Sequence, residues 1–136
     1  MTIEKKRIIV TGSASGMGEA TLNAYVKAGA HVIGMDVSDE KGIKICDKAN
    51  ENGPGKCSYI HIDVSDKSSV TNSFLKANDL LGGLDTLANP AAIQRSSDAS
   101  DVSVEDWDLM FAVNVKGTML TCLLYTSDAA DDVVGV

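Results

Sequence analysis

The segment of residues 11–18, Thr-Gly-Ser-Ala-Ser-Gly-Met-Gly, constrains the fold more than any other part of this chain. It follows the apolar run of residues 8–10 and leads into a segment of helical pattern that extends to Ala28. A strand that enters a helix through such a turn brings backbone N–H groups and the positive end of the helix dipole to one point, where they can bind a pyrophosphate. The pattern therefore predicts a phosphate-binding turn.

Three glycines of this turn serve different needs. We expect Gly12 to allow the tight exit from the strand, Gly16 to let the backbone approach the phosphates, and Gly18 to let the helix pack closely on the sheet. The alternative is that they are only turn and packing glycines. Their position together at one strand-to-helix junction favours the phosphate-binding interpretation.

Apolar runs of strand type alternate with segments of helical period along the chain. The runs are residues 7–11, 31–36, 57–63 and 84–88, and the helical segments are residues 18–28, 38–50 and 66–81, with a last helix that begins near Ser103. This alternation predicts an α/β fold, a Rossmann-type doubly wound parallel sheet truncated after about four strands. Ser65 is a predicted N-cap, Ser103 and Asp106 resemble a capping box, and Gly42 interrupts the helical pattern of residues 38–50.

Composition limits the class of partner. A chain of 136 residues can form one domain with one core, and its net charge of -7 argues against nonspecific binding to nucleic acid. No uninterrupted apolar run approaches the ~20 residues of a membrane span. The first residues lack the apolar stretch of a signal peptide, so we expect a cytoplasmic protein with no membrane partner.

The cysteines and histidines do not form a recognisable site. Cys46, Cys57 and Cys122 are scattered, with neither a CxxC spacing nor a nearby pair of histidines, so we expect buried free thiols and no metal centre. His31 and His61 lie in strand-like runs with no carboxylate or serine pattern around them. We expect both histidines to be structural.

Together these motifs resemble the short-chain dehydrogenase/reductase family. Its pattern is a Thr-Gly-x-x-x-Gly-x-Gly turn, an acid that ends the second strand, an Asp-Val pair after the third, an Asn-Asn-Ala-Gly run after the fourth, and an Asn within a helix. Here they stand as residues 11–18, Asp36, residues 63–64 and Asn114, while residues 89–92 read Asn-Pro-Ala-Ala in place of the fourth motif. The order and spacing fit over residues 1–121, which we predict to be the N-terminal part of an NAD-binding Rossmann domain.

The resemblance implies roles for particular residues. The cofactor-binding set it implies is Gly12, Ser15, Gly16, Met17, Gly18, Asp36, Asp63, Val64, Asn89 and Ala91. It implies that Asn114 is catalytic, with a backbone carbonyl that holds a water in a proton relay. Simpler alternatives stay open: Asp36 and Asp63 could each cap the following helix, and the Asn114 amide could be satisfied by neighbouring backbone.

NAD is the predicted cofactor, in preference to NADP. A carboxylate at Asp36 can accept hydrogen bonds from both ribose hydroxyls and would repel a 2′-phosphate. The next residue is Val37, and no arginine or lysine stands beside it or in the glycine turn. Pro90, which lacks an N–H, and Ala92, which adds a methyl group, are expected to weaken cofactor binding at the altered fourth motif.

Part of the family's machinery has no counterpart in this chain. Family members carry a Ser and a Tyr-x-x-x-Lys pair downstream of the helical Asn, whereas Tyr125 is followed four residues later by Ala129. The resemblance implies hydride transfer between nicotinamide and an alcohol or ketone by a homo-oligomeric full-length parent, with steroid, sugar, acyl and small-alcohol substrates all open. We expect this chain alone to be inactive. The alternatives are a noncatalytic dinucleotide-sensing module and, less favoured by the glycine spacing, a nucleotide-binding methyltransferase.

The last residues of the chain resemble something other than a protein family. The stretch Cys-Leu-Leu-Tyr-Thr-Ser-Asp-Ala-Ala-Asp from Cys122 is similar to one translated reading frame of a sequencing adapter. We therefore predict that residues 122–136 are a non-native tail. The alternative is a divergent helix end.

Overall fold

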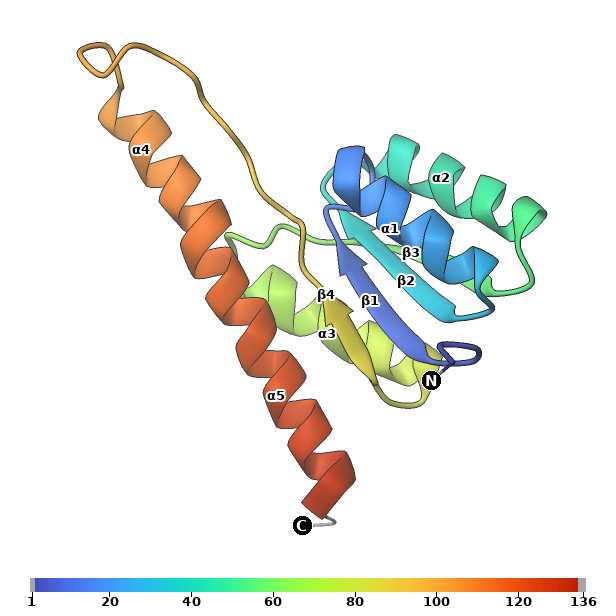
Figure 1. Ribbon diagram of the computed structural model, residues 1–136. Helices are drawn as coiled ribbons and strands as arrows, with labels where there is room; N and C mark the ends of the chain where they lie inside the picture. The colour runs from blue at the N-terminus through green and yellow to red at the C-terminus, as the bar shows by residue number, and fades with distance from the viewer. Residues whose placement is uncertain (1, 135–136) are drawn as a thin grey trace.

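The structure is a computed structural model that describes the backbone of residues 2–134 and the side chains of residues 2–126. Four strands and their connecting helices alternate along the chain, as the sequence pattern predicts (Figure 1). In chain order the elements are β1 (Arg7–Thr11), α1 (Gly16–Lys27), β2 (His31–Asp36), α2 (Asp39–Asn52), β3 (Lys56–His61), α3 (Lys67–Leu81), β4 (Thr86–Ala88), α4 (Val104–Phe111), the π-helical η1 (Ala112–Gly117) and α5 (Thr118–Val134).

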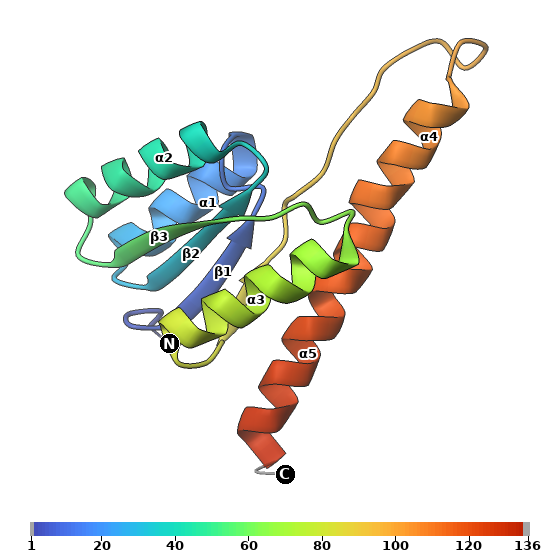
Figure 2. The ribbon, with the colours of Figure 1, turned by 180° about the vertical axis from the view of Figure 1, so that it is seen from behind.

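The strands form one parallel sheet in the order β3-β2-β1-β4. Ile9 of β1 stands opposite Ile33 of β2 on one side and Leu87 of β4 on the other. Helices α1 and α2 cover one face of the sheet, and α3 with the long C-terminal helix covers the other (Figures 1 and 2). The predicted doubly wound, Rossmann-type architecture is therefore confirmed.

Each face of the sheet has its own apolar core, because successive residues of a strand point to opposite faces. Ile8 and Val10 pack with Leu22 and Val26 of α1, whereas Ile9 packs with Phe74 of α3 on the other face. Apolar residues on both faces explain why β1 reads as a continuous hydrophobic run.

Gly42 does not interrupt α2, which runs through it without a break. A Cβ atom at Gly42 would lie 2.1 Å from Cε2 of Tyr59, so the aromatic ring of β3 occupies the place of a side chain. The helical pattern fails at this position because the tertiary contact requires a residue without a side chain.

The structure shows which residues cap the N-termini of α3 and α4, the two helices whose caps the sequence predicts. Asp66, one residue beyond the predicted Ser65, caps α3 by accepting hydrogen bonds from the backbone N–H groups of Ser68 and Ser69. Ser103 caps α4 and accepts from the Asp106 N–H, as predicted. The Asp106 carboxylate lies 3.6 Å from Arg95 Nε, an ion pair to the preceding loop.

Elements α4, η1 and α5 continue as one long helix (Figure 1). Its inner side, at Val113, Leu120, Leu124 and Tyr125, packs against the core beneath the sheet. Helix α4 has no buried residue and exposes Trp107 and Phe111, whose rings stack with their centroids 4.8 Å apart.

Within the described residues, the stretch Val104–Thr126 is long and apolar enough to cross a membrane. Core helices of water-soluble domains pass the same test of length and composition. This stretch also packs against the core through residues 113–125, so it does not by itself indicate a membrane protein.

The predicted non-native tail lies only partly within the described region. The side chains of residues 127–134 and all of residues 135–136 are outside it, including Asp128, Asp131 and Asp132. Of the tail residues that are described, Leu124 and Tyr125 contact the core, and the Tyr125 hydroxyl lies 3.2 Å from the Asp85 carbonyl oxygen. Cys122 is exposed, which corrects the expectation of three buried thiols, because it lies on the solvent side of α5.

Asp85 joins the loop before β4 to the first residue of β1. Its carboxylate accepts hydrogen bonds from Arg7 at the backbone N (2.8 Å), at Nε (3.0 Å) and at Nη2 (2.9 Å). These bonds lower the pKa of Asp85 to about 2 from 3.8. The carboxylate therefore stabilises the fold above pH ~4, and this contribution is lost as the pH falls toward 2.

The Asp85→Asn variant is expected to unfold at lower urea concentration than the parent chain at pH 7, by about 1–2 kcal/mol, because solvent partly screens the pair. The difference should shrink steadily below pH 4 and become small by pH 2, where about half of the folded carboxylate is protonated. Asp79→Asn, at an exposed position of α3, is the matched control and should change stability little at any pH. An Asp85→Asn deficit that is as large at pH 2 as at pH 7 would show that the carboxylate charge is not what stabilises the contact.

Candidate functional site

An open pocket of about 780 Å³ lies at the carboxyl ends of the strands. Parallel α/β sheets bind ligands at this edge, where the strand order reverses, and here the reversal falls between β1 and β4. The pocket is lined by Gly12, Ser15, Gly16, Met17, Gly18, Asp36, Val37, Ile62, Asp63, Val64, Pro90, Ala91, Ala92, Ile93, Gln94, Met110, Val113 and Asn114. Ten of the eleven predicted site residues are in this lining, and Asn89 is the exception.

The glycine turn is closely packed at two of its three glycines. Gly12 has φ +63°, and a Cβ atom there would lie 2.8 Å from Cα of Ala91. A Cβ at Gly18 would lie 1.9 Å from the Gly12 carbonyl oxygen, so the turn itself occupies the space that we expected the sheet to fill. Gly16 has φ +51° with open space around it.

The N-terminus of α1 faces the pocket through this turn. Ser15 is the N-cap residue, and its side chain makes no capping hydrogen bond, although its carbonyl oxygen accepts from Glu19 N. The first N–H groups of a helix have no partner within the helix. This helix start is therefore suited to an anionic ligand.

Asp36 connects the glycine turn to the loop after β2. Its Oδ2 accepts from Ala14 N and its Oδ1 from Ser38 N, each at 3.0 Å. Ser38, not Asp36, is the N-cap of α2, so the alternative role of Asp36 as a helix cap is wrong. A carboxylate offers about four acceptor positions. Two backbone donors hold this one in place and leave acceptor capacity toward the pocket.

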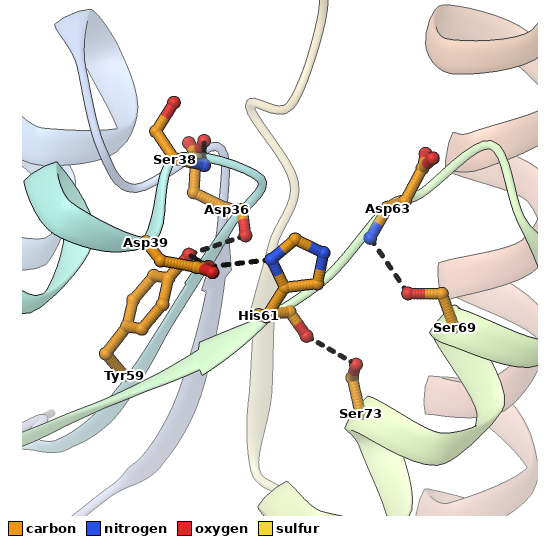
Figure 3. A network of polar contacts seen from close by, with 8 residues as sticks. All are labelled: Asp36, Ser38, Asp39, Tyr59, His61, Asp63, Ser69 and Ser73. Carbon is orange, nitrogen blue, oxygen red and sulfur yellow. Dashed lines mark hydrogen bonds and ion pairs between the residues drawn. The ribbon is translucent and has the colours of Figure 1, made fainter.

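A polar network connects the backbone carbonyl of Asp36 with the side chains of Asp39, Tyr59 and His61 (Figure 3). The Tyr59 hydroxyl lies 2.6 Å from the Asp36 carbonyl oxygen and 2.8 Å from Asp39 Oδ1, and the same carboxylate oxygen lies 2.7 Å from His61 Nδ1. Hydrogen bonds from His61 and Tyr59 lower the pKa of Asp39, and burial raises the pKa of Tyr59.

The contact of His61 with Asp39 has no counterpart in a local sequence pattern, and it is compatible with the expected structural role of this histidine. Asp39 and His61 are far apart in sequence and meet because β2 and β3 are adjacent, with Asp36 opposite His61 in the register. Asp39 follows β2 at the start of α2, close to the end of β3. The only signal in the sequence was that each residue stands at the carboxyl end of its strand or just beyond it.

Asp63 and Val64 form the wall of the pocket beyond β3. Asp63 Oδ1 accepts from Ser65 N (2.9 Å) and from the Ser65 hydroxyl (2.6 Å), while Asp66 caps the following helix. The alternative role of Asp63 as a cap of α3 is therefore wrong. Val64 is buried against the long helix, where a Cβ at Gly117 would lie 2.8 Å from Val64 Cγ2.

Asn89 lies beneath the pocket. Its Oδ1 accepts from the Thr11 hydroxyl, and its Nδ2 donates to the Thr121 hydroxyl oxygen at 2.9 Å. The side chain thereby joins the end of β1 to α5 and holds the following residues, Pro90 and Ala91, at the pocket wall. Its direct contact with a cofactor stays a prediction.

Asn114 lies in the π-helical turn η1, at the end of the pocket nearest β4. Its Oδ1 accepts from Ile93 N and its Nδ2 donates to Ile93 O, both at 2.9 Å. The side chain is thus satisfied by backbone, while its own carbonyl oxygen accepts from the Thr118 hydroxyl at 2.8 Å. Single π turns are frequent at functional sites. The catalytic role of Asn114 stays a prediction.

Comparison with curated proteins finds dehydrogenases and reductases. The chain is 35% identical over 119 residues to a sorbitol dehydrogenase of Cereibacter sphaeroides, covering 88% of this chain and 45% of that protein. It is 35% identical over 117 residues to a 3-oxoacyl-[acyl-carrier-protein] reductase of Thermotoga maritima, covering 86% and 47%. The chain therefore spans about half the length of these relatives.

Solved structures agree on the fold. A short-chain type dehydrogenase/reductase from Mycobacterium marinum matches with a TM-score of 0.91 and 25% identity, over 96% of this chain and 53% of that one. A short chain dehydrogenase/reductase from Burkholderia phymatum, solved in complex with NAD, matches with a TM-score of 0.88 and 23% identity, over 94% and 45%. The family model for short chain dehydrogenases matches residues 6–133. This chain accordingly belongs to the short-chain dehydrogenase family of oxidoreductases.

Proposed function

We propose that this chain is the NAD-binding half of an oxidoreductase whose full-length form transfers a hydride between nicotinamide and the carbinol or carbonyl carbon of an alcohol or ketone substrate. The observation that carries the proposal is the placement of Asp36, which the turn residue Ala14 binds directly and which lines the same pocket as Gly12 and Gly16. A phosphate-binding turn and a ribose-binding carboxylate on one pocket wall are what a dinucleotide needs.

The strand order supports an orientation for the dinucleotide. Asp36 and Asp63 follow β2 and β3 on one side of the glycine turn, and residues 90–94 follow β4 on the other. We place the adenosine beside Asp36, Asp63 and Val64, and the pyrophosphate at Ser15, Gly16 and Met17. The nicotinamide, which supplies the hydride-transferring carbon when bound, then lies toward Ala91 and Asn114.

Preference for NAD over NADP follows from charge. Among the described residues that line the pocket, the ionisable ones are Asp36 and Asp63, and neither lysine nor arginine is present. A 2′-phosphate beside Asp36 would meet a like charge with no cation to offset it, which costs several kcal/mol at a desolvated contact. The ribose hydroxyls of NAD would instead donate to this carboxylate.

We expect this chain by itself to lack turnover. Residues 2–126 contribute Asn114 to the pocket but no tyrosine and lysine pair to exchange a proton with the substrate oxygen. In the full-length parent, Asn114 would hold the loop at Ile93 and a water of the proton relay. The competing function is a noncatalytic dinucleotide-sensing module. Recovery of a downstream Ser and Tyr-x-x-x-Lys from the complete gene would favour the enzyme, and their absence would favour the sensor.

The proposal also covers the partners of the protein, its location in the cell and the residue at which the native sequence ends. We propose a small-molecule substrate, a homo-oligomeric parent and action in the cytoplasm. We also propose that the native sequence in this chain ends near Thr121 and that residues 122–136 are a non-native tail. The family match to residue 133 and the core contacts of Leu124 and Tyr125 support the competing reading, a divergent helix end. Sequencing the source locus across codons 117–136 decides between them.

Titration of the chain with NADH, followed by the cofactor's fluorescence, tests the binding proposal. We expect saturable binding of NADH and binding of NADPH that is at least tenfold weaker, because one like-charge contact costs more than 1.4 kcal/mol. The variant Asp47→Asn, an exposed acid of α2, should leave both affinities unchanged. A chain that is folded by circular dichroism but binds neither nucleotide would contradict the proposal, and equal affinity would contradict the NAD preference.

A further inference from the structure

Helix α2 is held on strand β3 along one helical face. Residues 42, 46 and 50 are four apart and therefore lie above one another on the helix. Gly42 receives the Tyr59 ring, Cys46 meets Cys57, and the Asn50 amide binds the Cys57 backbone, donating to its carbonyl oxygen at 2.9 Å and accepting from its N–H at 2.8 Å. This face fixes the position of Cys57 relative to α2 in both backbone and side chain.

Cys46 and Cys57 form a buried pair of thiols. Their side chains are 3% and 7% exposed, and the two Sγ atoms lie 2.9 Å apart, with the Cys57 S–H donating to the Cys46 sulfur. Below them, a Cβ atom at Gly34 would lie 3.1 Å from Cys46 Sγ, so the glycine of β2 leaves room for the sulfur to rest on the sheet. The two sulfurs are already closer than ordinary nonbonded contact.

We propose that Cys46 and Cys57 are a reversible dithiol and disulfide couple, a modification site at which hydrogen peroxide converts two thiols into a cross-link between α2 and β3. The inference does not depend on the cofactor or on the activity of the parent. It rests on the placement of the two sulfurs by the Gly42, Asn50 and Gly34 contacts.

The chemistry assigns a different part to each sulfur. The hydrogen bond from Cys57 lowers the pKa of Cys46, whereas the same bond and burial raise the pKa of Cys57. The Cys46 thiolate attacks one peroxide oxygen: an S–O bond forms, the O–O bond breaks, and the departing hydroxide takes up a proton to become water. Cys57 then attacks the Cys46 sulfur, an S–S bond forms, the S–O bond breaks, and a second water leaves with the Cys57 proton. Two electrons pass from the sulfurs to the peroxide.

Burial sets the rate of this reaction. The oxidant can reach Cys46 only when α2 lifts from the sheet, and α2 begins at Ser38 without a side-chain capping bond. Exposed Cys122 does not have this restriction and reacts independently. Oxidation of the pair is therefore expected to be slower than modification of Cys122 and faster than global unfolding.

The test uses the full chain with Cys122→Ser, which removes the exposed thiol. After treatment with hydrogen peroxide, we expect the intact mass to fall by two hydrogen atoms, peptide mapping to recover a Cys46–Cys57 link, and dithiothreitol to restore the original mass. The oxidised chain should also melt roughly 5–10 °C above the reduced one, because the cross-link restricts the unfolded state. The further variants Cys46→Ser and Cys57→Ser should each abolish the mass loss.

A second measurement keeps the result independent of whether those variants fold. The same oxidation is carried out on the Cys122→Ser chain in urea, where the contacts of α2 with β3 are absent. Because burial slows the oxidation itself, the products are compared at equal loss of the Cys46 thiol. A cross-linked share that is several-fold larger in buffer than in urea supports the proposal. Equal shares, or addition of oxygen to Cys46 with no cross-link, would overturn it.

Discussion

Replacement of Asp36 by alanine is expected to weaken NADH binding by 100-fold or more. The carboxylate would accept two hydrogen bonds from the ribose, and a hydrogen bond to a charged group contributes about 1.5–3 kcal/mol. The substitution also removes the acceptors of Ala14 N and Ser38 N, which loosens the glycine turn itself. Fluorescence titration of the parent and variant chains with NADH measures the loss.

Charge and hydrogen bonding at this position can be separated with Asp36→Asn. The amide keeps one acceptor oxygen but removes the repulsion of a 2′-phosphate, so the ratio of NADH to NADPH affinity should fall by at least tenfold. Asp47→Asn is the control, since Asp47 is an exposed acid of α2 that neither lines the pocket nor contacts Asp36. It should leave the ratio unchanged. If Asp36→Asn also left it unchanged, Asp36 would not be the group that selects the cofactor.

Gly18→Ala is expected to destabilise the chain by about 2–4 kcal/mol, the largest loss among the glycine substitutions of the turn. The added methyl carbon would lie 1.9 Å from the Gly12 carbonyl oxygen and 2.5 Å from the Gly12 carbonyl carbon. Both are backbone atoms, so no side-chain rotation can relieve the overlap. Either β1 or α1 must move, and urea unfolding at pH 7 measures the cost.

The matched control is Gly16→Ala, in the same turn. No atom lies within 4 Å of a Cβ there, and the only cost is the positive φ of +51°, which is about 1–2 kcal/mol for an L-residue. The difference between the two alanine variants therefore isolates the overlap with Gly12. Gly18 does not have a positive φ, so equal destabilisation by both would mean that a small shift relieves the overlap and that close approach does not explain Gly18.

Local signals in the sequence were sufficient for the elements. The apolar run of β1 and the helical spacing of α3 predicted both elements, because hydrophobic periodicity depends only on which faces are buried. Gly42 was the exception. Its presence within α2 is explained only by Tyr59, a residue of β3 whose ring packs against it.

The candidate site likewise contains residues that the sequence predicted and residues that it did not. The turn and Asp36 were predictable, since a phosphate-binding turn needs glycines within a few residues of one another and the acid ends the next strand. Asp39 and His61 were not, because they meet across the β2 and β3 register. The contact between Cys46 and Cys57 was not predictable for the same reason, because nothing in their spacing indicated that helix α2 would hold the two sulfurs together.

The sequence by itself determined the parallel α/β class, the glycine turn, the acid at Asp36 and membership of a dehydrogenase family, because each depends on residue type and short-range order. Only the tertiary structure decided which side chains satisfy which partners. Asn89 lies beneath the pocket and not in it, the Asn114 amide binds Ile93, and Asp66 in place of Ser65 caps α3. Such pairings depend on distances between elements that the packing of the two cores sets, and no local pattern encodes those distances.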